Sequence, residues 1–496
     1  MNPNFPSSFN FSLGDELRGE IVGLASGGQG IIRHAGFVIF VPFTAPGDLI
    51  SCRIVKKKKN YADAELIEIH HPSVLRATPP CPYYGRCGGC QLQHLNDEAQ
   101  LEYKKLWVEE SLKRIGKLPM QVLPPVVPAT MRWGYRRHIT LSLKPENGAF
   151  IAGYIAVDNH SLVKVSSCPI FTSEKDNVIQ HVQSFAQMLQ SHPGDAGKVA
   201  IIKHVEGHCL LNVHFNRLPT NYVEACENTL ARHSQSYCPR PQIEVLTCAK
   251  APAVGRSEGP QYYQYGGPSD RSNPGALAQS KPQFMAAGSI AGIVVNSPGK
   301  QFSFGETTLT LKVDDLTFLF SPQVFVQNHP EQSMNIYQTI CRLAKDSKFI
   351  LDLYCGIGVS SVLLAKQGAD VLGVESNAES VRLAKVNAEN NTVSNVRFLQ
   401  ADVEQVIKER LQRRAPDLAI VNPPRIGLSN AVVKALLENG PAEIIYISCM
   451  PSTLARDLQA LCAERYRLSS CQAFDMFPQT AHIETVVCLK RDLHGS

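Results

Sequence analysis

The chain has 496 residues, of which 44% are hydrophobic and 19% charged, and its formal net charge is +5 at pH 7. This length predicts several domains with cores of their own, and the composition excludes wholesale disorder. There is no apolar run near the roughly 18 residues of a membrane span, and no signal-peptide pattern at the start, so we expect a cytoplasmic protein without a membrane partner.

The first part of the chain predicts a small β-barrel. Residues 14–72 contain short apolar runs between glycine-rich turns, and we expect strands at 18–24, 36–41, 49–56 and 61–68. The basic run Lys56–Lys59 would lie on the hairpin between the last two strands. A hairpin of this kind presents lysines to a phosphate backbone, although a solubilising loop has the same pattern.

Two further basic stretches follow at 103–117 and 133–138, where Lys and Arg alternate with Tyr and Trp. Basic and aromatic side chains together suit phosphate contact and base stacking, so these stretches favour an RNA partner. The alternative is a solvated helix face, because a net charge of +5 does not by itself demonstrate nucleic-acid binding.

Cys81, Cys87 and Cys90 form a C-x5-C-x2-C pattern with two glycines before the last cysteine. Cys168 is the candidate for a fourth ligand, because it precedes a proline as Cys81 does. The odd total of 15 cysteines, without a secretory signal, argues against a disulfide framework. Four thiolates suit an iron–sulfur cluster, which we expect to be [4Fe-4S], while a tetrahedral zinc ion or unliganded core thiols remain alternatives.

Residues 131–300 alternate apolar and polar positions in short runs and predict a β-rich central domain. Residues 250–283 are rich in Gly, Pro, Ser, Gln and Tyr and predict a flexible insertion. A hairpin is expected at 309–320, followed by a helix that ends near Lys345.

The stretch from Phe349 to Glu375 predicts strand, glycine turn, helix and strand. Gly356 and Gly358 permit a tight turn close to an adenosine-carrying ligand, and Glu375 follows about 20 residues later, where a carboxylate commonly binds ribose hydroxyls. An ordinary turn without ligand is the alternative. Ser361 interrupts the GxGxxG pattern of nicotinamide enzymes.

The chain continues with an expected helix at 378–390, a strand at 396–399 before Asp402, and a strand at 418–421 before Asn422-Pro-Pro-Arg. Alternating strands and helices predict a doubly wound, Rossmann-like α/β sheet. This series resembles an S-adenosylmethionine-dependent methyltransferase.

Two reactive side chains stand near the end of the chain. Cys449 follows an apolar strand, where doubly wound sheets place reactive groups, and Glu484 follows His482 at the start of another strand. Packing is the more ordinary role of a lone cysteine, and a solvated strand edge that of a glutamate.

The motifs occur in the order C-x5-CGGC-x2-QH, FVQ, DLYCGIG, NPPR-x-G, SC-x-P-x-T and H-x-E-x-V. Together they resemble the RNA 5-methyluridine methyltransferases, in the branch with a TRAM domain and an iron–sulfur cluster that acts on ribosomal RNA. The resemblance covers nearly the whole chain except the insertion. It implies a TRAM domain at 1–72, a central cluster-bearing domain at 73–300 and a methyltransferase domain at 301–496, with a monomer as the default state.

The resemblance also implies roles for single residues. Cys449 matches the nucleophile that adds to C6 of uracil, and Glu484 matches the base that removes the C5 proton. S-adenosylmethionine would be bound by residues matching Gln327, Tyr354, Glu375, Asp402 and Asn422. The chain departs from the family where Asn422 replaces an aspartate and where Val359 and His329 replace asparagines, which predicts changes in cofactor affinity and rate.

Two other functions remain open. Asn422-Pro-Pro also occurs in amino-group methyltransferases, although Arg425 replaces their stacking aromatic and they have no use for Cys449. A non-catalytic RNA-binding or ribosome-assembly factor with a decayed cofactor site is the second, favoured by the three departures and disfavoured by the intact Cys449 and Glu484.

Overall fold

The structure is a computed structural model that describes residues 11–34, 37–119, 123–171, 177–204, 207–233 and 289–492. The predicted insertion at 250–283 lies outside these residues. No helix in the described ranges is long and apolar enough to cross a membrane.

The N-terminal part is a six-stranded sheet in the order β1-β5-β6-β4-β3-β2. Alternating buried positions on β4 and β5 enclose a core that includes Ile39, Val41 and Ile50. As predicted, the lysine run lies at the β5–β6 hairpin, where the Lys58 amide donates to the Tyr61 carbonyl at 2.8 Å. The strands are β1 (Glu16–Glu20), β2 (Gly23–Leu24), β3 (Gly30–His34), β4 (Phe37–Val41), β5 (Leu49–Lys57) and β6 (Tyr61–His71).

Helix α1 (Asp97–Arg114) begins at Asn96, whose side chain accepts a hydrogen bond from the Ala99 amide. The prediction that its basic and aromatic residues face RNA is wrong for two of them. Lys104 is fully buried, and Trp107 is 5% exposed and donates to the Leu24 carbonyl at 3.1 Å. Both side chains face partners that are distant in sequence, so their roles are internal.

The central part is a seven-stranded sheet in the order β13-β12-β11-β10-β7-β8-β9. Two helices that the sequence analysis did not predict pack against it, α2 (Val178–Met188) on β8 and α3 (Tyr222–His233) on β12. The expected boundary at 300/301 falls at the start of β13, so this sheet continues to Gly305. Its strands are β7 (His138–Glu146), β8 (Ala149–Ile155), β9 (Leu162–Lys164), β10 (Gly197–Lys203), β11 (Cys209–Phe215), β12 (Ile290–Ser297) and β13 (Lys300–Gly305).

The C-terminal part begins with the predicted hairpin, β14 (Leu309–Val313) and β15 (Leu316–Phe320), and helix α4 (Pro330–Leu343). A seven-stranded sheet follows in the order β18-β17-β16-β19-β20-β22-β21. The strands from β18 to β20 are parallel, and β22 is antiparallel to both of its neighbours. Chain order reverses between β16 and β19, and doubly wound sheets bind ligands at such a reversal. The elements are β16 (Phe349–Leu353), α5 (Val359–Lys366), β17 (Asp370–Glu375), α6 (Ala378–Asn390), β18 (Val396–Gln400), α7 (Val403–Arg413), β19 (Leu418–Val421), α8 (Asn430–Asn439), β20 (Glu443–Ser448), α9 (Pro451–Glu464), β21 (Tyr466–Phe474) and β22 (Glu484–Arg491).

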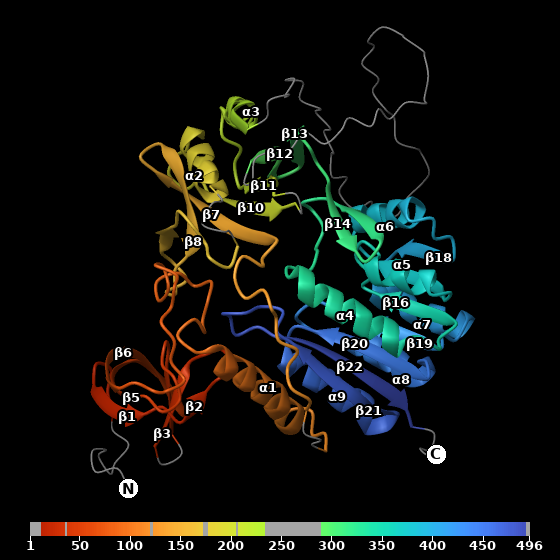
Figure 1. The fold of residues 1–496 in the computed structure, drawn as a ribbon, viewed down its shortest axis with the longest axis horizontal. Coiled ribbons are helices and arrows are strands. Elements are labelled where there is room, and N and C mark those ends of the chain that lie inside the picture. The colour runs from red at the N-terminus through yellow and green to blue at the C-terminus, as the bar shows by residue number, and fades with distance from the viewer. Residues whose placement is uncertain are drawn as a thin grey trace, which may run out of the picture.

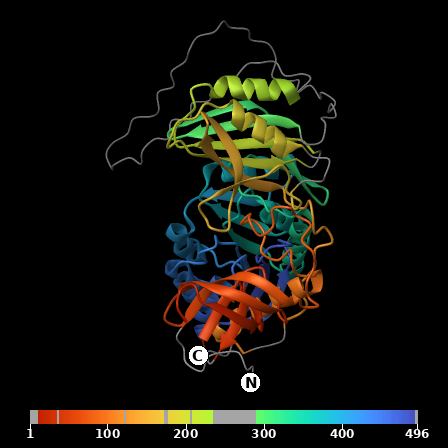
Figure 2. The same cartoon turned by 90° about the vertical axis from the view of Figure 1, so that its left-hand side faces the viewer.

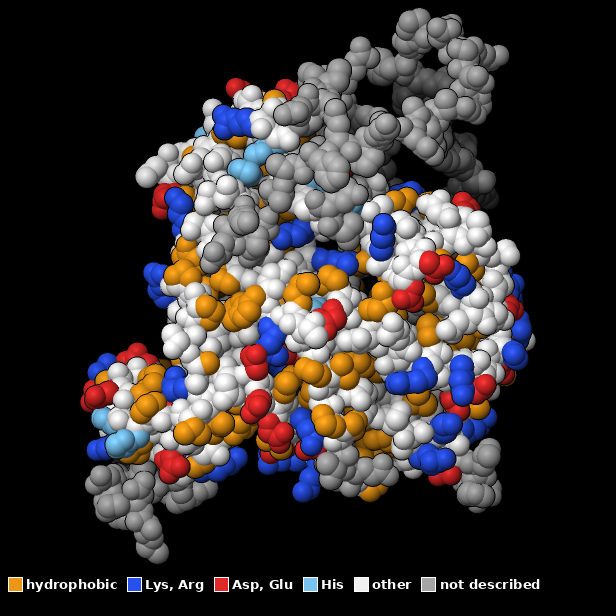
Figure 3. All heavy atoms as spheres, viewed as in Figure 1, with side chains coloured by type: hydrophobic (Ala, Val, Ile, Leu, Met, Phe, Trp, Pro, Cys, Tyr) orange, Lys and Arg blue, Asp and Glu red, His pale blue; other side chains and the backbone are white. Residues whose placement is uncertain are grey.

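Figure 1 shows the C-terminal sheet between its helices, with the central sheet above it and the N-terminal sheet below and to one side. The turned view in Figure 2 places the N-terminal and central sheets at opposite ends. On the face in Figure 3, Lys and Arg are interspersed with Asp and Glu rather than gathered into one basic area. The strand orders of the C-terminal and central sheets confirm the predicted doubly wound fold class with a β-rich central part.

Candidate active site

The thiol of Cys449 and the carboxyl of Glu484 lie at neighbouring strand ends. Cys449 directly follows β20, and Glu484 begins β22, which pairs antiparallel with β20 through Ser448 and Thr485. Continuing that register by one residue places Cys449 opposite Glu484. Glu484 is only 3% exposed, which excludes the alternative of a solvated edge residue, whereas Cys449 keeps partial access to solvent.

Arg425 is the third member of this group. Burial raises the pKa of Glu484 to about 8, and the positive charge of Arg425 opposes that shift. Burial, and then the nearby Glu484, raises the pKa of the Cys449 thiol, whereas the charge of Arg425 and its hydrogen bond to the thiol lower it. Arg425 therefore favours the anionic form of either neighbour, a role that sequence reasoning did not assign to it.

The loop that carries Arg425 is fastened to α9. Thr453 donates to the Arg425 carbonyl at 3.2 Å, and Asp457 accepts from the Leu428 amide at 2.8 Å. Gly427 has a φ of +79°, and a Cβ there would come within 2.4 Å of the Asp457 carboxylate. Because α9 begins just after Cys449, one helix positions both the thiol and the guanidinium.

A cavity of about 70 Å³ lies at the carboxyl ends of β16, β19 and β20. Its lining includes Asn422 and Ile447, which are close in the chain to Arg425 and Cys449. Three of the predicted cofactor residues, Gln327, Tyr354 and Asn422, line it. Gly358, with a φ of +81°, is the N-cap of α5, and a Cβ at this position would come within 2.7 Å of the Phe398 ring. The turn therefore requires glycine where the backbone borders the cavity.

The other two predicted cofactor residues lie beside the cavity rather than in its lining. Glu375 accepts from the Gly356 amide at 3.1 Å and from the Asn377 amide at 2.8 Å. Asp402 is the N-cap of α7, and its carboxylate accepts a hydrogen bond from the Glu404 amide. Burial raises the pKa of Tyr354 to about 12, and the negative charges of Glu404 and Asp402 add to the shift. All of these groups share one edge of the sheet.

Asp352 is a cavity residue to which the sequence analysis gave no role. It is 1% exposed and accepts hydrogen bonds from Ser360 at 2.7 Å and Ser361 at 2.6 Å. Burial raises its pKa to about 6, against the effect of these two hydrogen bonds. The sequence offered one signal for Asp352, namely an acidic residue near the end of an apolar strand. Its partner Ser361 is the residue that breaks the GxGxxG pattern.

The departures at positions 329 and 359 differ in their surroundings. His329 is fully buried, accepts from the Gln332 amide at the start of α4 and stacks on Tyr135 at a ring distance of 4.8 Å. It does not line the cavity, so this histidine has a structural role. Val359 is 5% exposed and does line the cavity, where it presents an apolar surface.

The four predicted ligand cysteines, Cys81, Cys87, Cys90 and Cys168, line one pocket near the central sheet. The Gly89 amide donates to the Cys87 sulfur at 3.4 Å, and the Tyr154 hydroxyl donates to the Cys168 sulfur at the same distance. Among the described residues, however, no group of three or more Cys, His, Asp or Glu side chains has an arrangement that could hold a metal ion.

These features define a doubly wound methyltransferase-type fold with a thiol and a carboxyl at the strand ends near its cavity. Residues 292–492 match the family model described as tRNA (Uracil-5-)-methyltransferase, and residues 17–75 match the TRAM domain of tRNA (uracil(54)-C(5))-methyltransferase. The chain belongs to the RNA uracil-5-methyltransferase family and carries a TRAM domain, as the sequence motifs predicted.

Similar proteins cover almost the whole chain. An uncharacterized RNA methyltransferase of Protochlamydia amoebophila is 43% identical, over 96% of this chain and 98% of its own length. One from Synechocystis is 32% identical, over 98% of both chains. The crystal structure of Pyrococcus abyssi tRNA (uracil-54, C5)-methyltransferase with S-adenosyl-L-homocysteine has a TM-score of 0.65 and 24% identity, over 95% of this chain and 100% of that chain, and shows the same fold.

Proposed function

We propose that the protein methylates C5 of a uridine in RNA with S-adenosylmethionine, through covalent addition of Cys449 to C6. The observation that carries this proposal is the placement of Cys449 with Glu484 and Arg425 beside the cavity at the strand reversal. The proposed cofactor is supported by the Pyrococcus relative, whose structure contains S-adenosyl-L-homocysteine.

C5 of uracil is too weak a nucleophile to accept a methyl group unaided. The Cys449 thiolate adds to C6, and the electron pair of the C5–C6 double bond moves towards C5 and the adjoining carbonyl. Bound S-adenosylmethionine supplies an electrophilic methyl group: C5 forms the new carbon–carbon bond while the sulfur–methyl bond breaks, which leaves S-adenosylhomocysteine. Glu484 then takes the C5 proton, the released electron pair restores the double bond, and the C6–sulfur bond breaks to free the thiolate.

The charges of Cys449, Glu484 and Arg425 are compatible with this order of steps. Cys449 and Glu484 repel each other when both are ionised, and Arg425 is near both. Once the sulfur is bonded to C6 it carries no charge, so Arg425 is left to stabilise the Glu484 carboxylate alone. Formation of the covalent bond thereby prepares the base that later breaks it.

Ribosomal RNA is the proposed substrate class, on the resemblance of the sequence motifs to the iron–sulfur branch of the family. The family descriptions name transfer RNA, so the two substrates need a direct comparison. Methyl incorporation into ribosomal and transfer RNA transcripts would decide between them. The three-domain division is retained as a proposal, with the second boundary placed after Gly305, where the central sheet ends. Limited proteolysis would test it.

The test of the function is denaturing electrophoresis after mixing the protein with S-adenosylmethionine and a ribosomal RNA fragment containing 5-fluorouridine. Fluorine at C5 cannot leave as a proton, so the protein is expected to form a heat-stable covalent band with the RNA. RNA binding without a band and without cofactor binding would instead support the non-catalytic assembly factor. Methylation of an exocyclic amine without a band would support the amino-group methyltransferase.

The residues around the cysteine pocket fit a [4Fe-4S] cluster in donor type. Four thiols line one pocket with Tyr83, Tyr154 and Arg136. A single zinc ion, whose tetrahedral geometry four thiolates also satisfy, is the second candidate for this pocket. When bound, the cluster would be held by Cys81, Cys87, Cys90 and Cys168.

We predict that anaerobically purified protein contains iron and sulfide and absorbs in the visible range. Cys87→Ser is expected to lose most of both, because a hydroxyl is a poor replacement for a thiolate ligand. Cys462→Ser, at a cysteine outside the pocket, is the control and should keep both. Stoichiometric zinc without sulfide would contradict the proposed cluster.

Glu375→Ala is expected to weaken S-adenosylhomocysteine binding about 10- to 100-fold, measured by calorimetric titration. The substitution removes the carboxylate proposed to bind the ribose and leaves the Gly356 amide without its acceptor. Glu379→Ala, in the first turn of α6 where its partner is Arg382, is the matched control. An unchanged dissociation constant for Glu375→Ala would remove Glu375 from the proposed cofactor site.

A further inference from the structure

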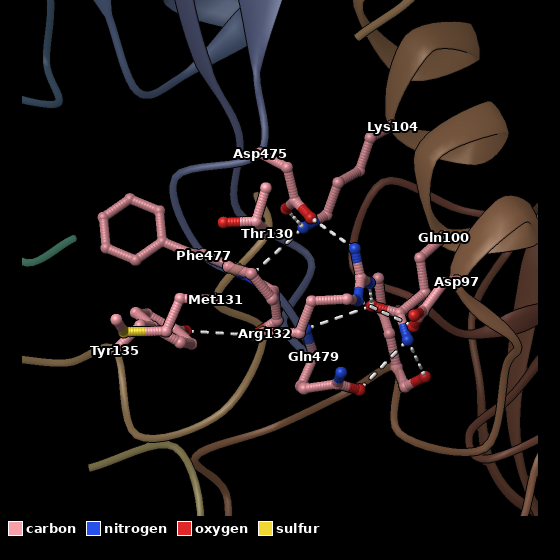
Figure 4. A network of polar contacts seen from close by, with 12 residues as sticks. Asp97, Gln100, Lys104, Thr130, Met131, Arg132, Tyr135, Asp475, Phe477 and Gln479 are labelled. Carbon is pink, nitrogen blue, oxygen red and sulfur yellow. Dashed lines mark hydrogen bonds and ion pairs between the residues drawn. The ribbon is translucent and has the colours of Figure 1, made fainter. Parts of the chain in front are cut away.

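The segment 475–483 joins β21 to β22 and leads directly into Glu484. The N-terminal half of the chain holds this segment, which we call the base turn, as Figure 4 shows. Lys104 of α1 is fully buried, forms an ion pair of 2.6 Å with Asp475 and donates to the Phe477 carbonyl at 3.0 Å. A charged side chain from the N-terminal half thus contacts both the start and the middle of the base turn.

Gln100, one helical turn before Lys104, makes a paired contact with the same segment. Its side-chain amide donates to the Gln479 side chain at 3.0 Å, and its oxygen accepts from the Gln479 backbone amide at 3.0 Å. Arg132 adds an ion pair of 3.2 Å to Asp475 and donates to Gln100 at 3.3 Å. Both ends of the Gln100 amide group are therefore in use.

The residues that follow Cys90 contact the other side of the base turn. The backbone amides of Gln91 and Leu92 donate to the Gln479 carbonyl at 3.2 and 3.0 Å, and the Gln91 side chain accepts from the Ala481 amide. Ala481 also packs against a buried cluster that includes Leu92 and Trp107. Gln91 directly follows Cys90, whereas Gln100 and Lys104 belong to α1. The base turn is therefore fixed from two separate segments.

Stability alone does not explain these buried polar contacts. Removing Lys104 and Asp475 from water carries a large desolvation penalty, and well-packed apolar side chains often stabilise a buried site as well as an ion pair does. Hydrogen bonds, in contrast with apolar contacts, fix direction and register. The contacts converge on backbone groups of the turn that precedes Glu484, so orientation is what they provide.

We propose that Lys104 and Gln100 are positioning residues for Glu484, which act on removal of the C5 proton rather than on attack by Cys449. This inference rests on the proposed function. Cys449 is held by β20 and α9, which neither residue contacts by a hydrogen bond in the described structure, so thiol attack should be independent of them. The TRAM-bearing half of the chain would then serve the release of the product as well as binding of the RNA.

The test compares Lys104→Met and Gln100→Met with Lys105→Met. Lys105 is the next residue on α1, and its ion pair is with Glu109, away from the base turn. Two reactions are followed: trapping on 5-fluorouridine RNA, which needs no proton removal, and turnover on unmodified RNA. For both test variants we expect trapping within about threefold of the wild type and turnover about 10- to 100-fold lower, with a methylated covalent adduct accumulating on unmodified RNA.

Each other outcome has a distinct meaning. Turnover like that of Lys105→Met in both test variants, or equal losses in trapping and turnover, would overturn the positioning role. Gln100→Met preserves side-chain volume and adds no buried charge, so it tests the inference even if Lys104→Met fails to fold. Absence of trapping by the wild-type protein would instead refute the proposed function itself.

Discussion

Cys449→Ala is expected to lower turnover by about 10⁴-fold or more and to eliminate the covalent band on 5-fluorouridine RNA. Without the thiolate nothing adds to C6, and C5 remains too electron-poor to accept a methyl group. Cys449 follows the end of β20 and is partly exposed, so its truncation should leave folding, cofactor affinity and RNA affinity close to those of the wild type.

The measurement is incorporation of a labelled methyl group, with thermal unfolding and RNA binding followed in parallel. Cys471→Ala, at a buried cysteine of β21, is the control for loss of a thiol and should keep its turnover. Full methylation by Cys449→Ala would show that the mechanism does not use this thiol.

Glu484→Gln is expected to form the methylated adduct and fail to release it. Loss of a positioned general base lowers rates by about 10²- to 10⁴-fold, and here the loss falls on the resolving step. On unmodified RNA the variant should therefore accumulate a covalent band that the wild type shows only transiently. Rapid-quench sampling of the band and of free methylated RNA separates the two steps, and normal release by Glu484→Gln would exclude Glu484 as the base.

The same substitution should change the pH dependence of stability. The pKa of Glu484 is about 8 in the folded protein, above its usual value of 4.5, so the folded state keeps this proton longer than the unfolded state. The stabilising contribution of the protonated carboxyl is complete below pH 4.5 and is lost as the pH rises towards 8, by about 5 kcal/mol for a shift of that size. Glutamine does not ionise.

Thermal unfolding of wild-type protein and Glu484→Gln between pH 5 and 9 would measure this difference. The melting temperature of the variant should rise relative to that of the wild type as the pH increases, and the difference should level off above pH 8. A difference that does not depend on pH would mean that Glu484 is ionised in the folded protein throughout this range.

Local sequence patterns predicted much of the C-terminal sheet. Helix α6 and strand β19 have the predicted bounds, because asparagine, aspartate and proline delimit their apolar positions. The family motifs also identified Gln327, Tyr354 and Asn422, which the structure places around one cavity. These predictions depend on neighbours in the chain or on motifs that are themselves short.

Features that depend on distant partners were not predictable in this way. Lys104 has the sequence appearance of a surface lysine, and only its contact with Asp475, 371 residues away, makes it internal. The burial of Glu484 depends on β22 lying between β20 and β21, which no local pattern specifies. Helices α2 and α3 were missed because the alternating strands around them dominated the interpretation of that region.

The strand order of the C-terminal sheet has a consequence for synthesis of the protein. Strand β22 lies between β20 and β21 although it follows both in the chain, so the thiol of Cys449 is translated before the strand that carries its base partner. Lys104 is translated earlier still, and its ion pair with Asp475 cannot form until that residue has also been translated. A nascent chain that stalls between Cys449 and Glu484 therefore lacks an assembled catalytic pair, and the reactive centre is completed only when β22 inserts.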